Sequence, residues 1–211
     1  SIVQISITNI IDTAGLEYNY KNLGQTWSSP RIFLLPNNGA GDTDIKDDLY
    51  VAVFGGGYGG NIPGVGSSVY VMNLENGKIL KEINIEDVNG NGIANSIPAT
   101  PVVITPDMVM NANYRGALVY INDLEGKITK INLTNMSDSR AQTGTSQIIS
   151  MYDSNTIFSA ESTSENGRYM FHSLEAGIGK DSNNLWLFSG TGNYTNLNDT
   201  GLLTDKNKID N

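Results

Sequence analysis

The chain lacks cysteine altogether and has a single histidine, His172. Disulfides, thiolate metal sites and cysteine nucleophiles are therefore excluded. A zinc site built on two histidines is excluded as well, and a histidine-based catalytic triad has only one candidate. His172 lies in the stretch YMFHSLEAG, and no G-x-S-x-G or other nucleophile motif occurs in the chain. We therefore expect a packed or surface histidine rather than a catalytic one.

Positive charge and long apolar runs are also scarce. The 211 residues include 13 Lys and Arg against 22 Asp and Glu, which gives a formal net charge of −9. A nucleic-acid partner needs a basic footprint, so the composition argues against one, and it disfavours an anionic membrane surface. No apolar run approaches the ~20 residues of a membrane-spanning helix. Because the chain opens at Ser1 inside a strand-like stretch, we expect an excerpt of a longer protein from which an N-terminal region is absent.

Glycine, in contrast, is abundant, with 23 residues. In LYVAVFGGGYGG (49–60), Gly55, Gly57 and Gly60 fit the G-x-G-x-x-G spacing of a dinucleotide-binding loop. That function requires a helix to begin at the glycines, because the helix N-terminus holds the pyrophosphate. The following residues, 61–78, contain further breakers and then the strand-like VYVMNL. The stretch therefore predicts a strand, a tight glycine turn and another strand.

Strand signals dominate the whole chain, and helical periodicity is nearly absent. Short runs rich in Val, Ile, Tyr and Phe are bounded by Gly, Asn, Asp and Pro. The predicted strands are RIFLL (31–35), LYVAVF (49–54), SVYVMNL (68–74), ATPVVI (99–104), ALVYIND (117–123), KITKINL (127–133) and NLWLFSG (184–190). Residues 134–168 are polar and loop-like, with one apolar stretch around QIISMY. Trp27 and Trp186 lie in strand-like contexts, so we expect them to pack between strands.

An internal repeat organises these strands. VYVMNLENGKILKEI (69–83) is similar to LVYINDLEGKITKI (118–131), and both give strand, turn, strand. Repeated antiparallel units of this size are typical of β-propeller blades. The chain would then form one all-β propeller domain over residues 1–211, with about three blades at roughly 23–85, 86–135 and 140–200. Closed propellers have ~4 to 8 blades, so we expect this one to be part of a larger ring whose other blades are absent.

The order of these stretches carries a family resemblance. LGQTWSSPRI, LYVAVFGGGYGG, SVYVMNLENGKILKEI, SIPATPVV, GALVYINDLEGKITKINL and LWLFSGTGNYTNLND follow one another between Leu23 and Asp199. Taken together, they resemble the C-terminal, quinoprotein-like β-propeller of the PilC/PilY type IV pilus biogenesis and tip-adhesin family. In that family the aromatic-Gly-x-Gly-Tyr stretch follows a blade strand and makes a turn.

The resemblance implies an exported, non-enzymatic protein at the bacterial cell surface, pilus tip or outer membrane. It would support pilus assembly, attachment and twitching motility. Its partners would be minor pilins or pilus-tip components, with host-cell or surface ligands bound through regions that are absent here. Two alternatives stay open at this point. One is a quinone-dependent dehydrogenase propeller, which needs a calcium ion and a catalytic Asp around its cofactor. The other is a propeller scaffold for outer-membrane assembly that binds partners through its loops.

Some members of the family carry a calcium loop of the D-x-D-x-D type. Calcium prefers six to eight oxygen ligands, and two stretches offer them. The first is GDTDIKDDL, with Asp42, Asp44, Asp47 and Asp48, where Lys46 could supply the balancing charge instead. Without a cation this first stretch would be a solvated acidic turn.

The second stretch is EDVNGNGIAN, in which Asp87, Asn89 and Asn91 occupy loop positions 1, 3 and 5. Position 12 of that loop is Pro98 instead of the usual bidentate Glu. An ordinary Asn-Gly turn is the other interpretation of this stretch. The family's loop after the T-P-x-P strand looks degenerate here, because ITPDMVMNANYRG has only Asp107.

Overall fold

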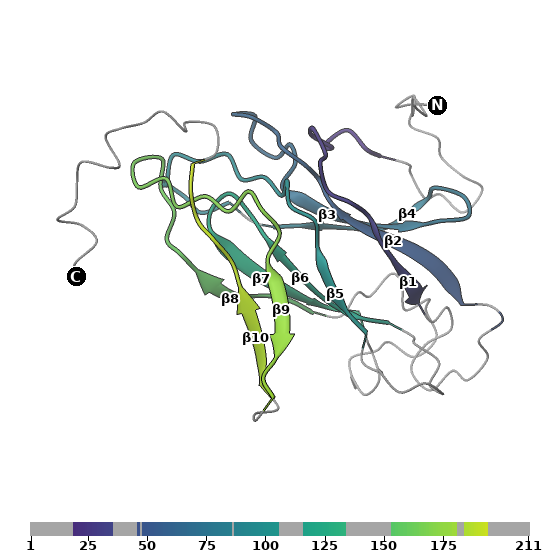
Figure 1. The fold of residues 1–211 in the computed structure, drawn as a ribbon. Coiled ribbons are helices and arrows are strands. Elements are labelled where there is room, and N and C mark those ends of the chain that lie inside the picture. The colour runs from purple at the N-terminus through teal and green to yellow at the C-terminus, as the bar shows by residue number, and fades with distance from the viewer. Residues whose placement is uncertain are drawn as a thin grey trace.

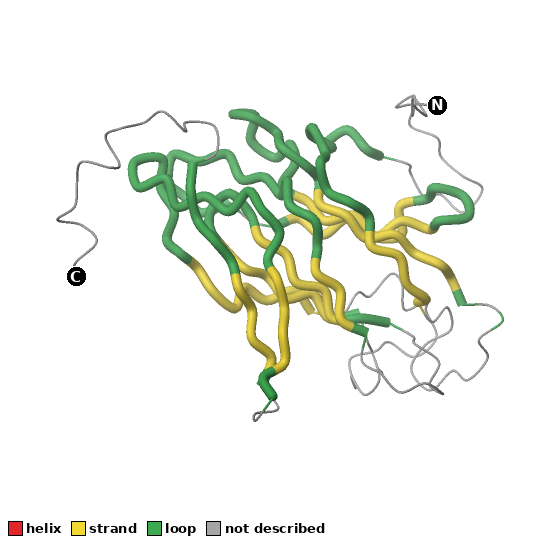
Figure 2. Tube along the Cα trace, in the orientation of Figure 1, coloured by secondary structure: helices red, strands yellow, loops and turns green. Residues whose placement is uncertain are grey.

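The described part of the chain is all-β. The computed structural model describes residues 19–35, 46, 48–85, 87–105, 116–133, 153–180 and 184–193. Strands and loops make up these residues, as Figure 2 shows. The predicted fold class is therefore confirmed, and the strand order is that of consecutive antiparallel sheets (Figure 1).

Two four-stranded sheets form the body of the structure. The first has the order β1-β2-β3-β4, and the second has the order β5-β6-β7-β8. Every neighbouring pair is antiparallel. The strands of the first sheet are β1 (Arg31–Leu35), β2 (Leu49–Gly55), β3 (Ser68–Asn73) and β4 (Ile79–Asn84). Those of the second are β5 (Val102–Ile104), β6 (Leu118–Asn122), β7 (Lys127–Asn132) and β8 (Asp153–Ser159).

A shorter sheet follows the second one. It consists of β9 (Glu175–Ile178) and β10 (Leu185–Phe188), which pair antiparallel. Two strands alone are marginally stable in water. The hairpin packs on the second sheet through a cluster that includes Tyr120, Leu174 and Leu187.

The main hydrophobic core lies between the two four-stranded sheets. Valines that alternate along the strands point to one face, as the period of two in a strand requires. Val53 of β2 and Val119 of β6 are both fully buried in this one cluster. The opposite face of β2 is also covered, because Phe54 packs on Tyr70 and Tyr20. Burial on both faces explains the continuous apolar run at residues 51–54 within LYVAVF.

Two predictions from the sequence were wrong. Residues 134–168 were expected to be loop, yet β8 (Asp153–Ser159) pairs along the whole of β7. Because β8 begins with the polar residues Asp-Ser-Asn, its pairing with β7 and not its own pattern makes the whole segment a strand. The two tryptophans were expected to be packed, but Trp27 is 60% exposed and Trp186 is 54% exposed. The division into three blades at 85/86 and 135/140 stays a prediction.

Candidate functional site

The glycine stretch makes a tight crossing of three segments and not a nucleotide loop. Residues 55–66 contain no helix. Gly57, at φ 90°, donates its N–H to Ile97 O at 2.9 Å, and Gly24 donates to Gly56 O at 2.8 Å. A Cβ on Gly57 would lie 2.6 Å from the backbone of Gln25, so a side chain cannot fit there. This confirms the interpretation of the stretch as strand and turn.

The connector between the two large sheets, residues 85–98, is where the polar residues of the fold gather. It is fixed at its end by Ile97, which is fully buried and pairs with Gly57. Just before that end it lies against the β6–β7 turn, since Leu124 donates its N–H to Ser96 O at 3.0 Å. A second tie leads to the following segment, where Ser164 donates to Asn91 O at 2.9 Å.

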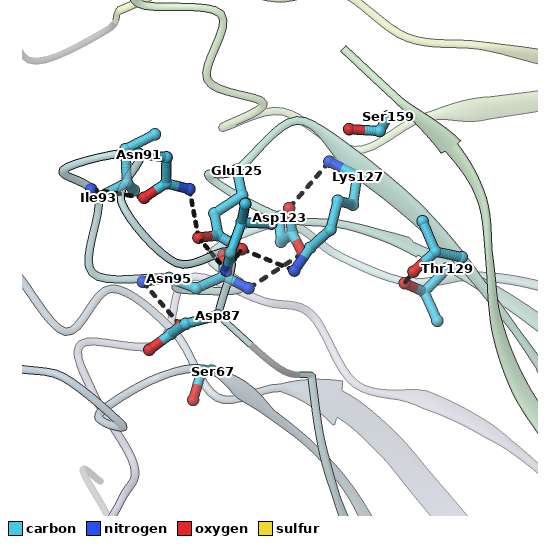
Figure 3. A network of polar contacts seen from close by, with 12 residues as sticks. Ser67, Asp87, Asn91, Ile93, Asn95, Asp123, Glu125, Lys127, Thr129 and Ser159 are labelled. Atoms are coloured by element: carbon cyan, nitrogen blue, oxygen red, sulfur yellow. Dashed lines mark hydrogen bonds and ion pairs between the residues drawn. The ribbon is translucent and has the colours of Figure 1, made fainter. Parts of the chain in front are cut away.

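Glu125, in the β6–β7 turn, accepts hydrogen bonds from the connector through its side-chain carboxylate. Its side chain is fully buried. Val88 of the connector donates its backbone N–H to both carboxylate oxygens, at 2.8 and 3.0 Å, and the Asn91 amide donates to Oε1 (Figure 3). A buried carboxylate is stable only when paired and hydrogen-bonded, and here donors from the connector meet that need.

Asp123 begins the same turn and makes the second tie. Its Oδ1 accepts the Lys127 backbone N–H at 2.9 Å, and its Oδ2 accepts the Asn95 amide at 3.1 Å. The residue is 1% exposed. Burial raises the pKa of Asp123 to about 6, against the lowering effect of the Lys127 ammonium.

Lys127 supplies the positive charge of the cluster. Its Nζ lies 2.6 Å from Glu125 Oε2 and 3.6 Å from Asp123 Oδ2. We call this set the lysine clasp: Asn91, Asn95, Asp123, Glu125 and Lys127. The clasp joins the β6–β7 turn of the second sheet to the connector that comes from the first sheet, so it fixes how consecutive sheets are linked.

The equivalent residues of the other repeat have a different environment. Glu75 and Lys78, in the β3–β4 turn, occupy the places of Glu125 and Lys127. Glu75 is exposed and Lys78 is half-buried, whereas both clasp residues are buried. The same short motif therefore becomes a surface turn in one hairpin and a buried charge cluster in the other. The connector, which covers only the second hairpin turn, makes the difference.

Most of the first predicted calcium loop, Asp42, Asp44 and Asp47, lies outside the described residues. Asp48, its last member, immediately precedes β2. Among the described residues, no three His, Asp or Glu side chains are placed to share a metal ion. The prediction for this loop therefore stays one from sequence.

The second predicted loop is described, and its side chains are spread over different environments. Asp87 is exposed and accepts the Asn95 N–H at 3.3 Å, and Asn89 is exposed. Asn91 is buried, with its oxygen accepting the Ile93 N–H at 2.9 Å and its amide turned to Glu125. The loop thus brings one exposed carboxylate, which fits calcium's demand for six to eight oxygens poorly.

The sequence pattern missed the residues that complete this site. No local spacing pattern predicts Asp123, Glu125 and Lys127 as site residues, because their partners in the connector lie far away in the sequence. Asn91 and Glu125, for example, are 34 positions apart. The signal that could have found them is the Glu–Lys pair that the repeat places in both turns. Sequence alone does not show which of the two pairs is covered.

A row of aromatic rings lies on the surface near the glycine crossing. Trp27 stacks on Tyr58 with ring centroids 6.0 Å apart, and Tyr58 is 6.2 Å from Phe171. Phe171 meets Tyr169 edge-on at 6.1 Å. His172 is exposed beside this row, so of the two expected settings, packed or surface, it has the second. A groove of about 400 Å³ lies beside Trp27, Phe171 and His172.

Consecutive antiparallel sheets that pack face to face and are linked by short connectors define a β-propeller type of protein. A solved structure agrees: the chain is similar to the crystal structure of the Pseudomonas aeruginosa PilY1 C-terminal domain, with a TM-score of 0.54 and 15% sequence identity. The similarity covers 81% of this chain and 33% of that one. The resemblance seen in the sequence is thus confirmed at the level of the fold.

The other comparisons found no relatives. No family model matches the chain, and no curated protein matches it. No helix in the described residues is long and apolar enough to cross a membrane.

Proposed function

We propose that the chain is part of a non-enzymatic propeller scaffold of a pilus-associated, exported protein. In this role it supports type IV pilus assembly, surface attachment and twitching motility, with minor pilins or pilus-tip components as partners. The single observation that carries the proposal is the fold similarity to the PilY1 C-terminal domain over 81% of the chain.

The chemistry of the buried charges supports a scaffold. The buried charged side chains of the described residues are Asp123, Glu125 and Lys127. They bond to one another and to the connector, so they hold structure together. The aromatic row, in which Trp27 is exposed and the other three rings are half-buried, supports a binding role, because aromatic residues are enriched at protein interfaces.

The proposal is tested in the bacterium that encodes the protein. The gene is deleted and complemented with the wild-type gene or with a Val119→Asp variant, which places a carboxylate in the fully buried core between the sheets. Sheared surface pilin and the diameter of twitching zones are measured. We expect the deletion and the Val119→Asp strain to lose both, and the wild-type gene to restore both.

A Lys130→Met variant is the matched control, since Lys130 lies half-buried on β7. It should complement fully. Normal pilin shedding and twitching in the deletion strain would contradict the proposal.

Calcium regulation is part of the proposal and rests on the sequence. We propose that Asp42, Asp44, Asp47 and Asp48 hold a calcium ion in the loop between β1 and β2, because four carboxylates within seven residues repel one another unless a cation neutralises them. The second loop, Asp87, Asn89 and Asn91, is the weaker candidate on the geometry given above.

A further inference from the structure

The lysine clasp has the arrangement of a cation site with an ammonium ion at its centre. Two carboxylates, Asp123 and Glu125, come from one turn and face the same ammonium group, that of Lys127. All three are at most 7% exposed, so water does not balance their charges. A cation between two carboxylates held this close in a dry interior stabilises their ionised forms.

The connector has the sequence pattern of a metal-binding loop. Its pattern of Asp87, Asn89 and Asn91, with Gly90 before the last of them and Gly92 after it, is that of a loop that wraps around a cation. In the structure, however, the buried members turn their N–H groups towards the carboxylates. Asn91 donates to Glu125, and Asn95 donates to Asp123. The loop thus closes on the acids of the hairpin turn, whose charge is met by Lys127.

We propose that Lys127 is a built-in cation that locks the connector onto the β6–β7 turn, so that this link between consecutive sheets is held without a bound metal ion. A divalent cation needs several oxygens turned towards it, and the clasp presents amide N–H groups instead. The position of the lysine is fixed by its own strand, since Lys127 begins β7 and its backbone N–H bonds Asp123 Oδ1. The lock therefore forms with the hairpin and requires nothing from solution.

The inference goes beyond the proposed function and does not depend on it. It concerns one loop, and its readout is local, so it can fail while the pilus role stands and can hold while the pilus role fails. It also distinguishes the two loops that the sequence offers as calcium sites. Removal of calcium by a chelator is expected to leave hydrogen exchange in the connector unchanged, whatever its effect on residues 42–48.

The test is hydrogen exchange, measured by mass spectrometry, on peptides covering residues 86–95 of the intact protein. For the wild type we expect the same exchange rate in chelator and in roughly millimolar calcium. For Lys127→Met, which keeps the length of the side chain and removes the charge, we expect exchange in these peptides to rise about tenfold or more, because the Val88 N–H loses its ordered acceptor.

The matched control is Lys78→Met, the equivalent lysine of the β3–β4 hairpin, which should leave the connector peptides unchanged. Asn91→Ala keeps the Lys127–Glu125 pair and removes a tie to the connector, so it should speed exchange even if Lys127→Met does not fold. Connector exchange that quickens in wild-type protein on chelation would overturn the proposal. So would a folded Lys127→Met protein with wild-type connector exchange, or an Asn91→Ala protein with no change.

Discussion

Asp123 is a residue whose own titration should be visible in the stability of the fold. Burial raises its pKa to about 6 from an ordinary value of 3.8. Between these two values the folded state binds more protons at Asp123 than the unfolded state does, so the contribution of this residue to stability is full below pH ~4 and is lost as the pH rises through ~6. The shift corresponds to a contribution on the order of 2–3 kcal/mol.

Urea unfolding midpoints measured from pH 4 to 7 check this expectation. The comparison that isolates this residue is with Asp123→Asn, which removes its titration. The variant should lose part of the downward slope between pH 4 and 6, whatever its absolute stability. Parallel curves for the two proteins would show that Asp123 does not titrate as its burial requires.

Glu125 should be far more costly to lose than Glu75, its equivalent in the other hairpin. Glu125→Ala leaves the Lys127 ammonium buried without its nearest partner, which costs about 3–5 kcal/mol. Glu75 is exposed, and Glu75→Ala should change stability by about 0.5 kcal/mol or less. Denaturant titration of both variants measures the difference. Equal losses would mean that the buried pair contributes no more than a surface residue.

At the scale of the element, the two equivalent hairpins allow a matched test of packing. Gly77 and Gly126 both have positive φ, 73° and 71°. A Cβ on Gly77 would meet nothing within 4 Å, whereas one on Gly126 would lie 2.9 Å from Arg168 O and 3.0 Å from Ala160 Cβ.

Gly77→Ala should therefore cost about 1 kcal/mol from backbone strain alone. Gly126→Ala should cost roughly 1–3 kcal/mol more, because overpacking adds to the strain. Thermal unfolding of both variants gives the comparison. A smaller loss for Gly126→Ala would contradict the close packing of the β6–β7 turn against residues 160–168.

Strands with a strong local pattern could be predicted, and strands defined by their neighbours could not. RIFLL (31–35) coincides with β1, because apolar β-formers between turn residues specify a strand without outside help. β8 and β9, in contrast, read DSNTIFS and EAGI. Only Thr-Ile-Phe within β8 favours a strand, and each segment becomes one over its full length because a partner strand offers its backbone groups.

The internal sequence repeat also predicted only part of the structure. It correctly identified two hairpins, but β3–β4 are the last two strands of their sheet and β6–β7 are the middle two of theirs. The repeat therefore relates hairpins and not the same positions in successive blades. The clasp could not be predicted for this reason: the two turn sequences are similar, and the connector covers the turn of one hairpin only. The exposed tryptophans were mistaken because a large ring next to a strand does not reveal which face another sheet covers.

At the scale of the whole molecule, the question is how a chain with a net charge of −9 uses cations. The clasp carries its own cation, Lys127, whereas the loop with Asp42, Asp44, Asp47 and Asp48 has only Lys46 among its four carboxylates. A surplus of acid close together in sequence is what a hard cation with oxygen ligands relieves. Cation sensitivity of the intact protein should therefore come from the loop between β1 and β2 and not from the connector.

Calcium titration by calorimetry on the intact protein measures this, with three variants beside the wild type. We expect one calcium-binding event, with a dissociation constant of about 10⁻⁴–10⁻³ M, as in extracellular modules. Asp42→Ala/Asp44→Ala should abolish it, because two of the four carboxylates are removed. Asp87→Ala and Asn89→Ala should leave it unchanged, because the connector is closed by Lys127. Binding that survives the double variant but disappears with Asp87→Ala would move the calcium site to the connector and would also overturn the role given to Lys127, since the same loop cannot be closed by an ammonium ion and remain open to a metal.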